Sequence, residues 1–264
     1  MKRSEFLRLL GVSALSIGIA PNVFANKKCD EKICREAWSK LCGNIGKVYK
    51  NDAFKYVHPV KRRPNVFLYG DSVSIGYTPQ VRKSLKGKAT VFRLFTNGGS
   101  SRNFISNMDR MRKAMFQPDL KGGWDFKWDL IHFNVGLHDL KYLANGHLDK
   151  KNGKQVSSIN EYKANLELIC RYLKTNFPDA KLIFATTTPV PPNAKGRYEG
   201  DSLRYNQAAR EVLVNYPDIV INDLYTITKP HQDEWAQEPG NVHFNEQGRA
   251  RQGEEVARLI ADNL

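Results

Sequence analysis

Cysteine is scarce in the 264-residue sequence, and the few cysteines do not form a metal-binding pattern. No Cys-x-x-Cys pair occurs, so a structural zinc site is not expected. Cys170 falls on the apolar stripe of an expected helix and is interpreted as a core thiol. Cys29, Cys34 and Cys42 lie close together near the beginning of the chain. Export would favour a disulfide among these three, and their spacing leaves the pairing open.

Glycine patterns that mark nucleotide-binding sites are missing too. Neither Gly-x-Gly-x-x-Gly nor Gly-x-x-x-x-Gly-Lys occurs, which makes a nucleotide-binding protein a weak interpretation. The Gly-x-Ser-x-Gly elbow of the α/β-hydrolases is absent as well. If the chain is a serine hydrolase, its nucleophile must therefore lie in another kind of turn.

Long apolar runs are lacking apart from one short segment near the start. Residues 9–20 are apolar but too short to span a bilayer comfortably, and no later run is long enough. A basic stretch precedes this segment, and small residues follow it up to Ala25. This order is typical of a secretory signal peptide, so we expect residues 1–25 to be removed from an exported, periplasmic or secreted protein. A twin-arginine signal or a retained anchor are the alternatives; cleavage would leave no stable membrane anchor.

Acidic residues are outnumbered by basic ones. The chain has 27 Asp and Glu against 41 Lys and Arg, a formal net charge of +14. Removal of residues 1–25 takes away three basic side chains and one acidic side chain, which leaves +12. Such a surface attracts anions, for example an acidic polysaccharide, an anionic cell surface or a nucleic acid. The basic residues are scattered and do not alternate with aromatic ones, so specific nucleic-acid binding is not expected.

The overall composition is that of an ordinary globular protein, with 41% apolar and 26% charged residues. A chain of 264 residues suits one domain with one sizeable core. Residues 26–60 show a helical pattern followed by a linker, and the pattern becomes regular afterwards. We therefore expect a helical extension over residues 26–60 and a single domain over residues 61–264.

Short apolar runs alternate with helical patterns along the main domain. The runs predict strands at residues 65–69, 90–95, 129–133, 181–185 and 219–221. The intervening patterns predict helices at residues 79–85, 101–115, 160–175 and 202–215, with a last helix capped by Asn245. This alternation predicts an α/β fold. We expect a three-layer α/β/α sandwich of the flavodoxin type with a five-stranded, mostly parallel sheet.

In such folds the chemistry lies in loops at the carboxyl ends of the strands. The first of these loops contains Gly70, Asp71 and Ser72. A serine at a turn between a buried strand and a helix can be exposed, with the positive end of the helix near its oxygen. It would still need an adjacent base to act as a nucleophile. The simpler interpretation is that Asp71 or Ser72 only caps the helix.

Two later loops carry groups that could bind a substrate. Gly98 and Gly99 would let backbone N–H groups approach a substrate closely, as an oxyanion hole requires; an ordinary turn is the alternative. Asn134, His138 and Asp139 follow the third strand and could donate to a substrate or hold another side chain. A helix cap and a surface histidine are the alternatives there.

His243 has the best placement for a general base among the six histidines. It lies just before the expected last helix, at the rim of the sheet. A lone histidine is more often structural, so the interpretation of His243 as a base depends on the other candidate loops.

Taken together, these loops resemble the SGNH (GDSL-like) hydrolase family over residues 64–262. Four short motifs occur in the family's order: Gly70 to Ser72, Gly98 with Gly99, residues 136–139 and residues 242–244. The third motif reads Gly-Leu-His-Asp where the family usually has Gly-x-Asn-Asp. Each motif is short, but their order and their positions on the expected elements match.

The resemblance implies hydrolysis of an ester through an acyl-enzyme, without metal or cofactor. It implies Ser72 as the nucleophile and His243 as its base. The oxyanion would be held by the N–H groups of Ser72 and Gly98 and by the His138 side chain. Alternative or supporting residues of this site are Gly99, Asn134, Asp71, Asp139 and Asn241.

Two departures from the family pattern concern this site. His138 stands where the family's oxyanion Asn is expected, and a neutral imidazole still offers one N–H there. Gly240, followed by Asn241, stands where the family's Asp is expected, three residues before His243. In serine proteases, loss of this carboxylate lowers the rate by about 10⁴-fold. The groups that could orient the histidine instead are Asp233, Glu234, Glu238 or a backbone carbonyl.

Export and the resemblance together imply an O-acetyl ester of an extracellular carbohydrate as the substrate, and the basic surface favours an acidic one. A lipase or thioesterase is less favoured because the sequence shows no extended apolar lid. The alternative from another class is a non-catalytic carbohydrate- or surface-binding protein on the same fold. The departures at His138 and Gly240 favour that alternative, whereas the intact Ser72 and His243 oppose it.

Overall fold

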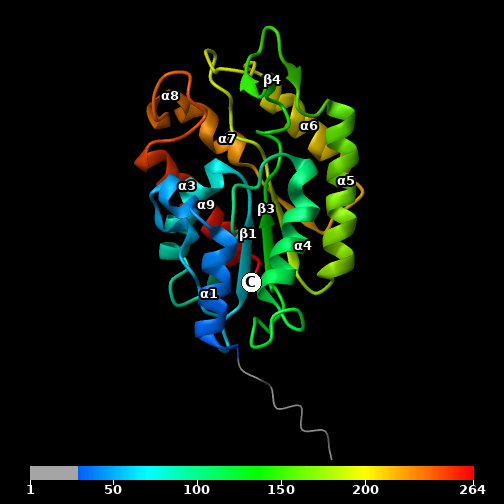
Figure 1. The fold of residues 1–264 in the computed structure, drawn as a ribbon. Coiled ribbons are helices and arrows are strands. Elements are labelled where there is room, and N and C mark those ends of the chain that lie inside the picture. Colours follow the sequence, from blue (N-terminus) through cyan, green and yellow to red (C-terminus); the bar gives the residue numbers. More distant parts are fainter. Residues whose placement is uncertain (1–28) are drawn as a thin grey trace, which may run out of the picture.

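The computed structural model of the protein describes residues 29–264 (Figure 1). The signal peptide expected over residues 1–25 lies outside the described residues. Within residues 29–264, no helix combines the length and the apolar character needed to cross a bilayer.

Five strands form the central sheet in the order β2-β1-β3-β7-β8. They are β1 (Asn65–Tyr69), β2 (Thr90–Arg93), β3 (Leu130–Phe133), β7 (Lys181–Ala185) and β8 (Ile219–Asn222). In the register, Phe67 of β1 lies opposite Phe92 of β2 and Ile131 of β3. The predicted α/β/α sandwich is confirmed, and the sheet, expected to be mostly parallel, is parallel at every pairing.

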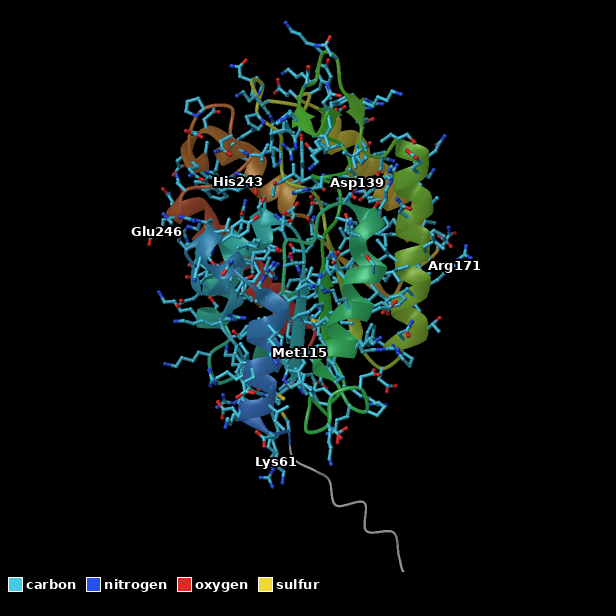
Figure 2. The ribbon with its side chains drawn as sticks, in the orientation of Figure 1. Lys61, Met115, Asp139, Arg171, His243 and Glu246 are labelled. Carbon is cyan, nitrogen blue, oxygen red and sulfur yellow. The ribbon has the colours of Figure 1, made fainter. Side chains whose placement is uncertain are left out.

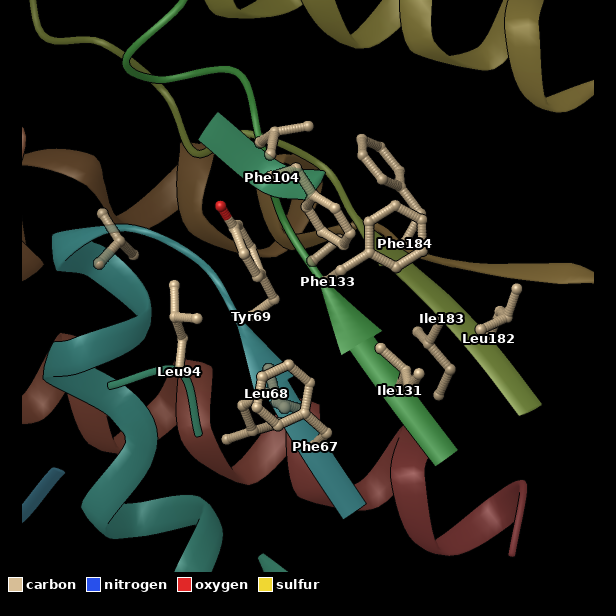
Figure 3. Close-up of a cluster of buried hydrophobic side chains, with 14 of the residues drawn as sticks. Phe67, Leu68, Tyr69, Leu94, Phe104, Ile131, Phe133, Leu182, Ile183 and Phe184 are labelled. Carbon is tan, nitrogen blue, oxygen red and sulfur yellow. The ribbon is translucent and has the colours of Figure 1, made fainter. Parts of the chain in front are cut away.

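The strands are nearly continuous apolar runs because helices cover both faces of the sheet. On one face, α3 (Ser72–Ser84) packs against α9 (Glu246–Asp262). On the other face lie α4 (Phe104–Met115), α5 (Ile159–Asn176) and α6 (Asp201–Leu213), and α4 is preceded by η2 (Ser101–Asn103) (Figure 1). Between the sheet and α4, the ring of Phe104 packs against those of Tyr69 and Phe133 (Figure 3). The expected core thiol, Cys170 of α5, is fully buried.

Helix α3 begins earlier than the sequence predicted. The predicted helix covered residues 79–85, whereas α3 starts at Ser72 and runs through Pro79. Asp71 caps its first turn by accepting from the Val73 N–H at 2.9 Å. Pro79 cannot donate to the carbonyl of Ile75, and the Asn51 side chain donates to that oxygen instead, at 3.5 Å. The nucleophile candidate is therefore the first residue of a helix.

Several elements at the carboxyl ends of the strands were not predicted. A small antiparallel sheet contains β4 (Tyr142–Ala144), β5 (His147–Leu148) and β6 (Lys154–Gln155). Between β8 and α9 lie α7 (Leu224–Thr228), η3 (Lys229–His231) and α8 (Gln232–Trp235). These short elements surround the loops that were expected to carry chemistry, at the upper end of the view in Figure 1.

The first described residues form α1 (Glu31–Cys42), α2 (Ile45–Tyr49) and η1 (Asp52–Phe54). They are joined to the core of the domain, because Trp38 is 5% exposed and its ring packs 6.0 Å from that of Trp124. The Trp38 indole N–H also donates to the carbonyl of Phe54 at 2.8 Å, which fixes η1 against α1. This segment thus holds a defined position beside α3 and α4.

Cys29 and Cys34 lie side by side at the start of α1, with their sulfur atoms 2.8 Å apart. Cys42 lies elsewhere, against the small apolar cluster that contains Phe54 and Ile75. Of the three pairings that the sequence left open, the structure therefore favours Cys29–Cys34.

We expect protein produced under oxidising conditions to contain a Cys29–Cys34 disulfide. Peptide mapping without reduction should give one crosslinked peptide containing both residues. Cys29→Ser should lower the free energy of unfolding by about 2 kcal/mol, because so short a loop constrains the unfolded chain only modestly. Cys42→Ser should leave the crosslink in place, and a crosslink that includes Cys42 would contradict the assignment.

Candidate active site

Ser72 and His243 meet at the carboxyl end of the sheet, although 171 positions separate them in the chain. The distance from Ser72 Oγ to His243 Nε2 is 2.8 Å, within hydrogen-bond reach for proton transfer. Ser72 follows β1 directly, and His243 lies just before α9, which packs against α3. Figure 2 shows His243 toward the end of the molecule opposite Lys61.

The second ring nitrogen of His243 contacts Asn241. Asn241 Oδ1 lies 2.8 Å from His243 Nδ1 and also accepts from the His243 backbone N–H at 3.0 Å. An amide oxygen is an acceptor only, so Nδ1 carries the proton in this arrangement. Nε2 then has a free lone pair directed at the Ser72 hydroxyl, which is the tautomer that a general base requires.

Glu238 fixes which way the Asn241 amide faces. Asn241 Nδ2 donates to Glu238 Oε1 at 2.9 Å, and the Asn241 backbone N–H donates to the Glu238 carbonyl at 3.1 Å. A carboxylate accepts only, so a flipped amide would place its NH₂ group against the His243 N–H and lose both contacts. The sequence predicts Glu238 as one possible direct partner of His243, and in the structure it contacts Asn241 instead.

The glycine at the family's Asp position has a steric explanation. Gly240 has a φ of +75°, and a Cβ atom there would lie 3.0 Å from the carbonyl oxygen of Asn193. A side chain at this position would therefore be strained in its backbone and crowded by the loop before α6. Glu234, another residue that the sequence suggests as a partner of His243, contacts His231 and Gln247 instead. Its Oε2 lies 3.0 Å from His231 Nδ1, and its Oε1 accepts from the Gln247 side chain.

The sequence predicts two oxyanion donors for the site, the Ser72 N–H and the His138 side chain. Ser72 is at the first position of α3, so its N–H is one of the helix-start groups that have no partner within the helix. The second donor is the ring of His138. Lys141 Nζ lies 3.2 Å from His138 Nδ1, and an ammonium can only donate. Nδ1 is therefore the acceptor nitrogen, and the ring proton is on Nε2.

Burial keeps both imidazoles neutral. It lowers the pKa of His138 to about 4, with the charges of Lys141 and Arg197 acting in the same direction. Burial also lowers the pKa of His243 below its ordinary 6.5; Arg197 adds to this effect, while the carboxylate of Asp71 opposes it. At neutral pH, His243 is thus available as a base and His138 as an N–H donor.

Three other groups expected as oxyanion donors are engaged elsewhere. The Gly98 N–H donates to the carbonyl of Gly70 at 3.0 Å, and the Gly99 N–H donates to Asn97 Oδ1 at 3.1 Å. The Asn134 side chain donates to the carbonyl of Ala185 at 2.7 Å. Gly98 is needed for a different reason, because a Cβ there would lie 2.8 Å from the Gly70 carbonyl oxygen.

Asp71 and Asp139 hold the loops of the site. Asp71, 2% exposed, caps α3. Asp139 accepts from the Ser101 N–H at 2.9 Å and from the Ser101 hydroxyl at 2.6 Å, which ties the third loop to the second. Burial raises the pKa of Asp139, and the bonds from Ser101 counter this shift.

Arg93 is a residue of this region that the sequence did not reveal. It ends β2 with 1% exposure and donates to the carbonyls of Leu94 and Thr96 at 2.9 and 3.2 Å. The same guanidinium donates to the hydroxyl of Ser74 at 3.0 Å and approaches the Gly70 carbonyl at 3.4 Å. It thereby clamps the loops after β1 and β2, although burial lowers its pKa to about 9. An arginine at the end of an apolar strand gives no sequence signal for this role.

A cleft of about 260 Å³ opens beside Ser72 and His243. Its walls include Tyr49 and Asn51 from the first described segment, together with Gln237 and Arg249. The segment expected to be an extension thus contributes to the candidate site. No three His, Cys, Asp or Glu side chains group as a metal site would require anywhere in residues 29–264.

Comparison with known proteins relates this arrangement to a family. Residues 68–251 match the family described as GDSL-like Lipase/Acylhydrolase. Among curated protein sequences, none matches the chain.

Solved structures share the fold at low sequence identity. The lipase/acylhydrolase from Enterococcus faecalis is 18% identical, with 76% of this chain and 97% of that chain covered and a TM-score of 0.57. An acetylxylan esterase from Geobacillus stearothermophilus is 16% identical, with coverage of 77% and 96% and a TM-score of 0.54. Because the family match covers most of the residues that form the sheet and the site, the chain belongs to the GDSL-like lipase/acylhydrolase family of ester hydrolases, as its motifs predict.

Proposed function

We propose that the chain is an exported serine esterase that removes O-acetyl groups from an extracellular carbohydrate. The observation that carries the catalytic part is the contact of 2.8 Å between Ser72 Oγ and a His243 ring held in the base tautomer by Asn241. The export part rests on the signal-like pattern of residues 1–25. The carbohydrate part is supported by the acetylxylan esterases among the proteins that share the fold.

In the acylation step, Ser72 Oγ attacks the acyl carbon while His243 Nε2 takes its proton. The negative charge that develops on the carbonyl oxygen is stabilised by the Ser72 N–H, at the positive end of α3, and by the His138 Nε2–H. The sugar oxygen then leaves with the proton from His243. The acetyl group remains on Ser72.

In the deacylation step, His243 accepts a proton from water, and the resulting hydroxide attacks the acyl carbon. Acetate leaves and the proton returns to Ser72. Asn241 is neutral and cannot stabilise the imidazolium as a carboxylate would. The Asp71 carboxylate, which raises the pKa of His243, supplies part of that stabilisation through space.

The walls of the cleft favour a small acyl group on a polar alcohol. Gln237 and Arg249 line the cleft together with apolar residues such as Val48, and a volume of about 260 Å³ is small for the long acyl chain of a lipid. A non-catalytic binding protein would not need the Ser72–His243 contact or the tautomer control by Asn241. The enzyme interpretation is therefore favoured over that alternative.

Ser72→Ala should abolish hydrolysis of p-nitrophenyl acetate. The melting temperature should stay nearly unchanged, because the cap of α3 is Asp71 and not the Ser72 hydroxyl. A serine-directed phosphonate should label the wild-type protein at Ser72 and leave the variant unlabelled. Turnover that persists in the variant would refute the assignment of the nucleophile.

Asn241→Leu should lower kcat by about 10²-fold or more, since the His243 ring would lose the acceptor that sets its tautomer and orientation. Asn241→Asp combined with Glu238→Gln keeps an acceptor for the ring proton and a donor for the new carboxylate, so this double variant should stay within about 10-fold of the wild type. Glu238→Gln is the matched control, because its side-chain oxygen can still accept from Asn241. A fully active Asn241→Leu would show that the ring is oriented by another group.

The pH dependence of kcat/KM should show an acid limb below pH 6.5. His243 acts as a base only when neutral, so activity is lost as the pH falls through its pKa, and burial places that pKa below 6.5. The measurement uses an uncharged ester with Ser72→Ala as the background. A limb centred above 6.5 would contradict the assigned environment of His243.

A further inference from the structure

Two cationic side chains beside His138 have no part in the chemistry described above. Lys141 follows the third loop, and Arg197 lies in the loop between β7 and α6. Neither belongs to the motifs through which the chain resembles its family. Neither makes an ion pair with a carboxylate within residues 29–264, and the nearby acids Glu199 and Asp201 pair with Lys229 and Arg204.

Arg197 is a buried charge with unused donors. Arg197 is 6% exposed, and its Nε donates to the carbonyl of Leu137 at 3.0 Å. Its two terminal nitrogens make no hydrogen bond to the described residues, yet they are not sealed from solvent. A neutral side chain could make the single bond to Leu137, and burial of an unpaired guanidinium opposes folding. Packing therefore does not explain why this position carries a charge.

The loop that contains Arg197 contacts both halves of the candidate site. Leu137, the acceptor of the Arg197 bond, immediately precedes His138. At the other end of the loop, Asn193 packs against Gly240 in the segment that carries His243. The positive charge of Arg197 lowers the pKa of both His138 and His243, as expected for a guanidinium close to both rings.

Lys141 adds a second charge at the same place. It is partly buried, and its ammonium lies 3.2 Å from His138 Nδ1. Burial and the charge of Arg197 both lower the pKa of Lys141, while the carboxylates of Asp139 and Asp71 act in the opposite direction without forming an ion pair with it. An anionic group bound here would relieve the desolvation of both side chains and their mutual repulsion.

We propose that Arg197 and Lys141 form an anion subsite that binds the carboxylate of an acidic sugar residue in the ester substrate. The planar fork of Arg197 suits a carboxylate bound through both oxygens, and Lys141 adds a point charge. This inference rests on the proposed esterase function and deepens it, because it makes the substrate an O-acetylated polyuronide in place of a neutral polymer.

The test uses two acetylated methyl glycosides that differ only in carrying a uronate carboxylate or a hydroxymethyl group. Wild-type protein should hydrolyse the uronide at least about 10-fold better in kcat/KM, as expected for a charge-assisted bond. Arg197→Gln should lower kcat/KM for the uronide by about 10- to 100-fold more than it changes kcat/KM for the neutral glycoside. Lys195→Gln removes an equal charge from an exposed position of the same loop and should preserve the preference.

Equal hydrolysis of the two glycosides by wild-type protein, or an equal loss on both in Arg197→Gln, would overturn the subsite. If wild-type protein neither hydrolyses p-nitrophenyl acetate nor reacts with the phosphonate, the result would instead count against the esterase function.

Calorimetric titration of wild-type protein tests the subsite without turnover and without a variant. Glucuronate should bind and glucose should not; absence of glucuronate binding overturns the proposal. Tighter binding of glucose 6-sulfate overturns the carboxylate assignment in favour of a sulfated glycan.

Discussion

The hydrogen bond between Ser72 and His243 depends on how closely α3 and α9 approach each other. Gly253 of α9 faces α3 so tightly that a Cβ atom there would lie 2.9 Å from the carbonyl oxygen of Tyr77. On α3, a Cβ at Gly76 would lie 2.9 Å from the side chain of Arg249. A larger residue at either glycine would separate the helices and with them the two ends that carry the site. The distance between hydroxyl and imidazole is thus set by backbone packing, well away from the reacting atoms.

In the proposed mechanism, His243 works with a neutral third member in place of a carboxylate. A carboxylate normally supplies both the acceptor for the ring proton and a negative charge. Here Asn241 supplies the acceptor, Glu238 holds the amide in the required orientation, and Asp71 supplies negative charge from the other side. Geometry and charge, which one aspartate combines, are divided among three residues. The loop at Asn193 leaves no space for that aspartate, so the backbone at Gly240 itself excludes a carboxylate side chain at this position.

Much of the fold could be predicted from the sequence because apolar runs and amphipathic patterns report burial directly, and the proximity of Ser72 and His243 could be predicted from their positions at strand and helix ends. Other features could not be predicted. The start of α3 was missed because Pro79 suggests a helix beginning, whereas the structure compensates for it with Asn51. The role of Arg93 depends on carbonyls of two separate loops, and that of Arg197 on a loop without regular structure. Such contacts between distant loops leave no periodic pattern in the sequence.

The cations around His138 also have a consequence for catalysis. In the free protein they strengthen His138 as an N–H donor, but they weaken His243 as a base by lowering its pKa. A carboxylate bound between Arg197 and Lys141 would neutralise part of this field. The pKa of His243 would then rise toward its ordinary value at the moment when an ester lies beside Ser72. An acidic substrate would in this way increase the basicity of His243, whereas a neutral substrate in the same cleft would leave it low.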